Sequence, residues 1–223
     1  VTVAGGEFEA ARRLKVIKPG KMTVIHNGLP DIDSVLRAKT GQYLPQLIMV
    51  ARFAAPKDHQ TLLRALADLQ RLEWNLVLVG DGPGRAAAEK LVSELGLEGR
   101  VSFAGVREDV HQLLAQSQVF VLSSRREGFP LSILEAMRAG LPVIASDAGG
   151  AAEAVQAGRS GLLFPPGNIR YLREALAILL VDITLRKKMG TAGRERFLEY
   201  FTLEKMVEKT LAVYYRVTKT GSD

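Results

Sequence analysis

Short apolar runs recur along the chain from about residue 47 onward. Most of their positions are apolar, rather than every second one, which is the pattern of strands covered on both faces of a sheet. The predicted strands are Leu47–Ala51, Leu76–Val79, Val101–Phe103, Val119–Leu122, Pro142–Ala145 and Gly161–Phe164.

The segments between these strands carry apolar residues at helical spacing. They predict helices over residues 58–72, 85–95, 110–115 and 131–139. Alternating strands and helices predict an α/β fold, here a Rossmann-like, doubly wound parallel six-stranded sheet. Ligands bind beyond the carboxyl ends of the strands in such sheets, so the loops that follow the strands are the first places to look for chemistry.

Two end segments fall outside this alternation. Residues 5–30 carry one short helical pattern and a predicted strand, Met22–Ile25, as the end of another domain and a linker would. Residues 168–218 are predicted to be helical almost throughout, with breaks near Asp182 and Phe201. The sequence does not begin with Met, so we expect a fragment of a longer protein or a processed chain.

Composition narrows the classes of function. The 223 residues are 47% hydrophobic and 24% charged, which is typical of a globular protein. The absence of cysteine excludes disulfides, thiolate metal sites and cysteine nucleophiles. A net charge of +6 favours anionic partners such as nucleotides, phosphorylated sugars or acidic lipid surfaces. Few aromatic residues accompany the basic ones, so we expect no nucleic-acid partner.

The most informative stretch is Ser123–Glu135, which follows a predicted strand and opens a predicted helix. Gly128 allows close approach of a ligand to the backbone, and the N–H groups of a helix start attract anions. Glu127 precedes the helix and Glu135 lies on its second turn, so both can face one ligand at different depths. The spacing alone is equally compatible with a helix cap at Glu127 and a solvated Glu135.

The sequence contains no motif for metal binding, for P-loop nucleotide hydrolysis or for a serine hydrolase of the Gly-x-Ser-x-Gly type. The three histidines, His26, His59 and His111, show no metal-ligand spacing, so we expect no metal site. A P-loop and a Gly-x-Ser-x-Gly elbow are both absent, which disfavours a P-loop nucleotidase and a serine hydrolase of that type.

The pair Glu127 and Glu135, with seven residues between them, resembles the signature of retaining GT-B glycosyltransferases, especially those of family 4. Further blocks match that family in order, over roughly residues 20–215. These blocks are Val24–Gly28, Val50–Arg52, Pro56–His59, Val79–Pro83, Ala139–Asp147 and Gly158–Leu163.

The resemblance implies roles for single residues. Arg52 and Lys57 would bind the diphosphate of a nucleotide-sugar donor and stabilise the charge of the leaving group; the alternative is that they are solvated surface cations. Glu127 would contact hydroxyls of the donor sugar, which makes it catalytic together with Lys57 and Arg52. Glu135 would accept hydrogen bonds from the ribose.

Backbone N–H groups around Gly128, Phe129 and Leu131 would hold sugar or phosphate oxygens. Pro130 stands where the family often has glycine, and it cannot donate an N–H. Arg107 would lie beside the base and ribose, or would be plain surface. The pair Gly149–Gly150, together with Glu153, would serve packing and helix entry, with donor contact as the lesser alternative.

The same resemblance implies a division into three parts. Residues 1–30 would be a remnant of an acceptor-binding domain and a linker, and residues 31–200 the nucleotide-sugar-binding domain. Residues 201–223 would form a C-terminal helix that crosses toward the first domain. Without that domain, the apolar side chains of this helix, including Leu211 and Tyr214, would be partly uncovered.

The implied function is transfer of a sugar from a UDP- or GDP-linked donor to a glycan or lipid-linked acceptor, as in polysaccharide biosynthesis, without a cofactor or metal. We expect a cytoplasmic location, with peripheral contact at the inner face of the membrane, and no transfer by the fragment alone. The alternatives are a sugar-nucleotide epimerase or glycan phosphorylase of the same fold, or a nucleotide-binding module without activity. A phosphorylase would need a lysine environment for pyridoxal phosphate that the sequence does not show.

Overall fold

The computed structural model describes residues 1–15 and 21–219. Its centre is a six-stranded sheet in the order β3-β2-β1-β4-β5-β6, and every neighbouring pair is parallel. The strands are β1 Gln46–Val50, β2 Asn75–Val79, β3 Val101–Gly105, β4 Val119–Leu122, β5 Val143–Ser146 and β6 Gly161–Phe164. This arrangement confirms the predicted α/β fold with a doubly wound parallel sheet.

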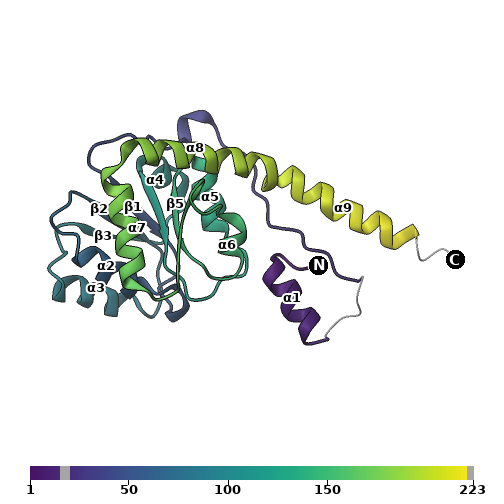
Figure 1. The fold of residues 1–223 in the computed structure, drawn as a ribbon, viewed down its shortest axis with the longest axis horizontal. Helices are drawn as coiled ribbons and strands as arrows, with labels where there is room; N and C mark the ends of the chain where they lie inside the picture. Colours follow the sequence, from purple (N-terminus) through teal and green to yellow (C-terminus); the bar gives the residue numbers. More distant parts are fainter. Residues whose placement is uncertain (16–20, 220–223) are drawn as a thin grey trace.

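Helices connect the strands and cover the sheet (Figure 1). Connections from β1 and from β4 run in opposite directions along the sheet, so right-handed crossovers place their helices on opposite faces. Accordingly α2 contacts α3 and α7, whereas α5 contacts α4, α6 and α8. The connecting helices are α2 His59–Ala67, α3 Arg85–Glu94, α4 Val110–Gln116, α5 Leu131–Ala139 and α6 Gly150–Ala154; two short 3₁₀ turns are η1 Ser34–Leu36 and η2 Ala55–Lys57.

The predicted helix over 58–72 ends earlier, at Ala67. Leu69 N–H donates back to the Leu66 carbonyl, and the buried Trp74 indole donates to the Leu69 carbonyl at 3.0 Å. These bonds fold the chain back toward β2. The apolar residues after Ala67 therefore pack from turns rather than from another helical turn.

The C-terminal third is helical with breaks where the sequence predicts them. Helix α7 spans Ile169–Val181, α8 spans Ile183–Tyr200 and α9 spans Leu203–Lys219. Asp182 caps α8 by accepting a hydrogen bond from Leu185 N–H at 2.8 Å. Thr202 Oγ1 accepts from Lys205 N–H at 3.4 Å and caps α9 in the same way.

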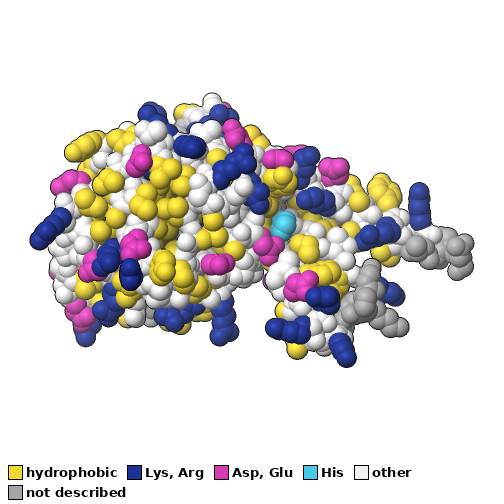
Figure 2. Space-filling view, in the orientation of Figure 1, with side chains coloured by type: hydrophobic (Ala, Val, Ile, Leu, Met, Phe, Trp, Pro, Cys, Tyr) yellow, Lys and Arg dark blue, Asp and Glu magenta, His cyan; other side chains and the backbone are white. Residues whose placement is uncertain are grey.

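The ends of the chain extend from this body (Figure 1). Helix α9 and the N-terminal helix α1, Gly5–Arg13, contain no buried residue. Leu211 of α9 is 45% exposed and Tyr214 is 64% exposed, as the family resemblance implies, and Met206 is partly exposed although its sulfur contacts Gly28 N–H. Figure 2 shows hydrophobic side chains on the surface of α9 beyond the body. That α9 crosses to another domain stays a prediction.

The predicted strand Met22–Ile25 is wrong. This segment lies outside the six-stranded sheet and pairs only through a single bridge, Thr2 with Val24. A second single bridge joins Leu29 to Thr202, at the junction of α8 and α9. Because each bridge involves a single pair of residues, no strand forms, and the segment is extended without regular pairing.

Candidate functional site

The strand order reverses between β1 and β4, because their connections run to opposite edges of the sheet. Such a switch point opens a crevice at the carboxyl ends of the two strands. Two segments border it: the β1 loop, residues 51–58, and the β4 loop, residues 123–130. Both carry predicted site residues, so the topology places them at one location.

Lys57 and Glu127 meet across this crevice. Lys57 ends η2 in the β1 loop, and its Nζ lies 2.5 Å from Oε1 of Glu127 in the β4 loop. The Glu127 side chain is only 7% exposed, whereas that of Lys57 is 28% exposed. An ammonium has three donors, so Lys57 can bind a phosphate oxygen while it keeps this contact. The site therefore joins a shielded carboxylate to an accessible cation.

Gly149 and Gly150 bring the loop that follows β5 into close contact with the backbone of Glu127. Gly149 has φ +54° and ψ −135°, and a Cβ built there would lie 1.9 Å from the Glu127 carbonyl oxygen. Gly150 N–H donates to the Gly128 carbonyl at 2.7 Å and begins α6. The expected packing and helix-entry role of this pair is thus visible in the structure. Donor contact by the pair stays a prediction.

The backbone around Gly128, Phe129 and Leu131 forms the entry to α5. Phe129 is buried, and its carbonyl accepts a hydrogen bond from Asn27 Nδ2 at 3.2 Å. Pro130 occupies the N-cap position, with no side-chain hydrogen bond to the first turn, and the exposed Leu131 follows as the first helical residue. Ile133 N–H donates to the Pro130 carbonyl at 3.2 Å, whereas the N–H groups of Leu131 and Ser132 have no acceptor among the described residues and are open to an anion.

Glu135 lies half-buried on α5 and has no hydrogen-bond partner among the described residues. Burial raises the pKa of its carboxyl above the ordinary value, and the charge of Arg138 opposes that shift. Within the described part of the chain it shares no bond or ion pair with Lys57 or Glu127. A ligand hydroxyl could satisfy this carboxylate, which fits a role apart from the Lys57–Glu127 pair.

The two predicted arginines lie outside that pair. Arg52 is exposed, two residues after the end of β1. Arg107 is bonded through two nitrogens to Asp109, at 2.8 and 2.7 Å, ahead of α4. This exposed pair fits the surface alternative for Arg107 at least as well as a place beside a base.

Several residues at the crevice were missed by motif reasoning. Asp58, Ser123 and Arg125 bond the two loops to each other, and Glu7 of α1 reaches Gly128: a Cβ built there would lie 3.1 Å from Glu7 Oε1. Asp58 had a signal, since an aspartate before a helical pattern is a favoured N-cap. The sequence carries no signal for the contact between Glu7 and Gly128.

The extended segment around His26 is fixed beside the β4 loop. Glu153 of α6 accepts hydrogen bonds from Gly5 and Gly6 N–H at 2.8 and 3.0 Å and contacts His26 Nε2 at 3.0 Å. The His26 ring in turn stacks on Phe129 with 4.6 Å between ring centroids. Glu153 therefore holds the start of α1 and the extended segment around His26 in place, which is more than the helix-entry role expected for it.

His59 begins α2 next to the crevice, as the sequence predicts. It is buried and stacks on Phe53 at 4.1 Å between centroids, and its Nε2 has no partner among the described residues. Burial lowers the pKa of its imidazole to about 4, an effect that Asp58 opposes and Lys57 reinforces. The folded protein thus keeps His59 neutral.

Stability is expected to fall on acidification because of His59. The unfolded chain takes up the proton first, near pH 6.5, so this stability is complete above 6.5 and is lost as the pH falls toward 4. The expected slope from this group is up to about 1.4 kcal/mol per pH unit. Urea unfolding of the wild type and of His59→Phe across this range measures it. Equal slopes in both proteins would contradict the assignment.

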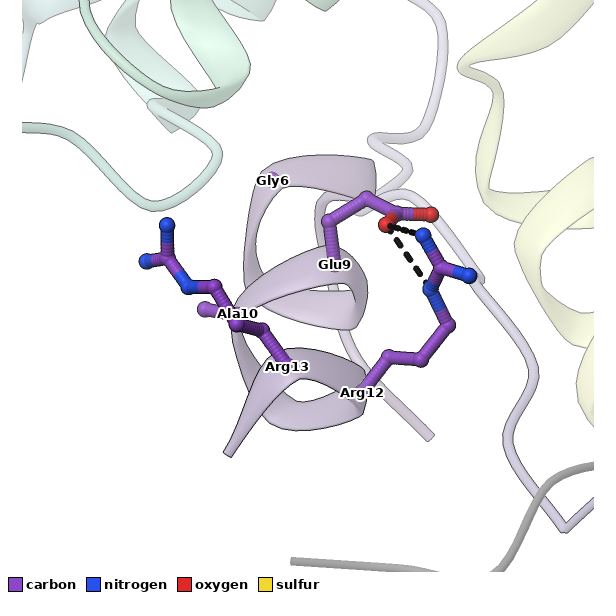
Figure 3. A pocket seen from close by; sticks show the side chains of 5 residues that line it. All are labelled: Gly6, Glu9, Ala10, Arg12 and Arg13. Atoms are coloured by element: carbon purple, nitrogen blue, oxygen red, sulfur yellow. Dashed lines mark hydrogen bonds and ion pairs between the residues drawn. The ribbon is translucent and has the colours of Figure 1, made fainter. Parts of the chain in front are cut away.

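The surface has hollows on α1 and beside the β1 loop. One of about 500 Å³ lies on α1 and is lined by Gly6, Glu9, Ala10, Arg12 and Arg13. Figure 3 shows the Glu9–Arg12 ion pair on one side of α1 and Arg13 on the other. None of the predicted site residues lines it. Another of about 340 Å³ adjoins the β1 loop, with His59 and Arg125 in its wall.

Within residues 1–15 and 21–219, no group of three or more His, Asp or Glu side chains is arranged to hold a metal ion. No helix in those same ranges combines the length and the apolar content needed to cross a bilayer.

Comparisons with known proteins identify the family of the chain. Residues 35–196 match the family model described as Glycosyl transferases group 1. The N-acetyl-alpha-D-glucosaminyl L-malate synthase of Bacillus anthracis is 36% identical over 174 residues, which is 78% of this chain and 46% of that protein. The chain therefore belongs to the group 1 glycosyl transferase family.

Solved structures give the same fold. The sucrose-phosphate synthase of Thermosynechococcus elongatus superposes with a TM-score of 0.84 at 30% identity, over 98% of this chain and 58% of that one. HepE of Anabaena, solved in complex with UDP-glucose, has a TM-score of 0.82 at 26% identity, over 93% of this chain and 61% of that one. The chain spans about half the length of the curated relative above.

Proposed function

We propose that this chain is the donor-binding part of a glycosyltransferase that transfers a sugar, with retention of configuration, from a nucleotide sugar to a glycan or lipid-linked acceptor. The observation that carries the proposal is the Lys57–Glu127 pair at the switch point of the sheet. Family membership and the UDP-glucose complex of HepE support it. In this proposal the donor is linked to UDP or GDP.

The chemistry follows from where charge develops. When the bond from the sugar to the diphosphate breaks, negative charge grows on the leaving oxygen. A fixed cation at that point stabilises the transition state more than the ground state. In the proposed complex Lys57 supplies this cation, and Arg52 adds a second one from the same loop. No step in this scheme requires a metal ion.

The carboxylates have separate tasks in this proposal. Glu127, held by Lys57, accepts hydrogen bonds from hydroxyls of the donor sugar and orients its anomeric carbon. Glu135, which lacks a hydrogen-bond partner among the described residues, accepts from the ribose. The open N–H groups at the start of α5 bind phosphate or sugar oxygens. The acceptor and the location in the cell stay predictions from the family resemblance.

The proposal predicts that Lys57→Ala weakens binding of a nucleoside diphosphate far more than binding of the nucleoside. A charge-assisted contact contributes about 1.5–3 kcal/mol, so UDP or GDP affinity is expected to drop roughly ten- to a hundredfold. Titration calorimetry with UDP, GDP and ADP against their nucleosides measures the difference.

Lys90→Ala is a matched control, since Lys90 lies on α3 with only a weak surface ion pair, 3.6 Å long, to Glu94. It is expected to leave both affinities unchanged. Equal losses for the diphosphate and the nucleoside in Lys57→Ala would refute the phosphate role. No binding of any of the three diphosphates at millimolar concentration would argue for a module that has lost donor recognition.

A further inference from the structure

The residue after Lys57 has an unusual backbone conformation. Asp58 has φ +49° and ψ +49°, the left-handed region that side-chain-bearing residues seldom occupy. This conformation costs a residue other than glycine roughly 1–2 kcal/mol, although aspartate tolerates it better than most. Something in the surrounding structure must hold the chain in this shape, directly beside the Lys57 cation.

The Asp58 side chain is held at both ends of its carboxylate. It is buried and accepts hydrogen bonds from Thr61 Oγ1 at 2.8 Å and Thr61 N–H at 3.4 Å, which caps α2. Its other contact is Arg125 Nε of the β4 loop, 2.9 Å from Oδ2. Asp58 therefore connects helix α2 to the loop that carries Glu127.

The backbone on either side of Lys57 is bound to the same loop. Ser123 Oγ lies 2.9 Å from the Asp58 carbonyl oxygen and 3.2 Å from that of Lys57, so one hydroxyl bridges both. Arg125 N–H donates to the Pro56 carbonyl at 2.7 Å. Three consecutive residues, 56 to 58, are thus bonded to the β4 loop.

These bonds fix where the Lys57 side chain begins. A lysine side chain has four rotatable bonds, and a cation that drifts by about 1 Å loses much of its effect on a reacting group. The Arg125 side chain is largely exposed, whereas that of Asp58 is only 7% exposed, so solvent screens one side of the ion pair. Besides any stability that it adds, this contact fixes the β4 loop against the residue next to Lys57.

We propose that Asp58, held by Arg125 and Ser123, is a positioning residue for Lys57: it fixes the β1 loop so that the lysine ammonium meets Glu127 and the donor diphosphate. This inference rests on the proposed function for the phosphate contact. The alternative is that Asp58 is only the N-cap of α2, with no effect on the site.

Binding of UDP and GDP, each compared with its nucleoside, tests the proposal in three variants. Asp58→Ala removes the carboxylate and disfavours the left-handed backbone, so diphosphate affinity is expected to fall roughly tenfold with nucleoside affinity unchanged. Asp58→Gly tolerates the backbone but lacks the bonds, and it is expected to show much of the same loss. Asp58→Asn tolerates the backbone but has only one acceptor oxygen, so it cannot keep both the Thr61 cap and the Arg125 contact. Its diphosphate affinity is expected to lie between wild type and Asp58→Ala.

A double-mutant cycle separates positioning from an independent structural role. If Asp58 acts through Lys57, Lys57→Ala and Lys57→Ala/Asp58→Ala lose the same diphosphate affinity. Additive losses, or equal losses for diphosphate and nucleoside in Asp58→Ala, would overturn the inference. Asp68→Ala is the matched control, because Asp68 ends the same helix and pairs with Arg173 at the surface. No change in Lys57→Ala alone would count against the proposed function instead.

A measurement without ligand tests positioning by itself. The rate at which an amine-reactive acetylating reagent modifies Lys57, measured by peptide mass spectrometry, reports on the contact with Glu127. Labelling of Lys57 is expected to speed up in Asp58→Ala and in Glu127→Gln alike and to be intermediate in Asp58→Asn, whereas labelling of Lys90 is expected to stay unchanged. Thermal unfolding curves first establish that wild type and Asp58→Ala are both folded. Equal rates of Lys57 labelling in the two proteins would then overturn the inference, whatever the binding data show.

Discussion

Alanine at position 149 is expected to remove most of the diphosphate affinity of the chain and to lower its stability by about 3 kcal/mol. The backbone of Gly149, with φ +54° and ψ −135°, lies in a region that residues with a Cβ hardly enter. Its Cβ would also meet the Glu127 carbonyl oxygen at 1.9 Å, where no atom can remain. The β4 loop must move, and Glu127 moves with it away from Lys57.

Titration calorimetry with UDP or GDP, together with urea unfolding, measures both effects. Gly158→Ala is a matched control, because Gly158 also has a positive φ, +76°, but a Cβ there would have no atom within 4 Å. Gly158→Ala introduces backbone strain but no steric clash, so its nucleotide affinity is expected to match wild type. If both variants bind equally well, the close contact beneath Glu127 does not position the site.

The sheet could be predicted from the sequence because burial on both faces leaves a plain signal. Val119–Leu122 and Val143–Ser146, for example, are buried at every position and form the centre of the sheet with β1. Asp182 likewise separated α7 from α8, because an aspartate that caps one helix interrupts the previous one. The failure at Met22–Ile25 shows the limit of this reasoning: the segment has strand-like residues but no adjacent strand.

The meeting of Lys57 and Glu127 was also within reach of the sequence, because each follows a strand and parallel strands end at one edge. The residues that hold Lys57 and Glu127 in place could not be predicted from the sequence. Gly5 and Glu153 are bonded across 148 positions, and Ser123 reaches Asp58 across 65. Periodicity shows which face of an element is buried, but it does not reveal which distant polar group a side chain will meet. Asp58 could be recognised as a cap, but not as a contact of Arg125.

Replacing Arg186 with leucine is expected to destabilise the fold by about 3 kcal/mol or more. Arg186 is fully buried in α8, and its guanidinium donates to four backbone carbonyls, two at the end of α7 and two in the segment before β1: Leu179, Leu180, Thr40 and Gln42. Burial lowers the pKa of this guanidinium, and Asp182 opposes the shift. Leucine fills part of the space but leaves these carbonyls without a donor, at about 1–3 kcal/mol for each that water cannot reach.

Urea unfolding of three variants separates the causes. Arg186→Lys keeps the charge but is too narrow to bond both segments, so its stability is expected to lie between wild type and Arg186→Leu. Lys188→Leu, an exposed position on the same helix, is expected to change the free energy of unfolding by less than about 0.5 kcal/mol. A loss in Arg186→Leu as small as that in Lys188→Leu would mean that water satisfies the carbonyls, and that the guanidinium does not tie α7 to the segment entering the sheet.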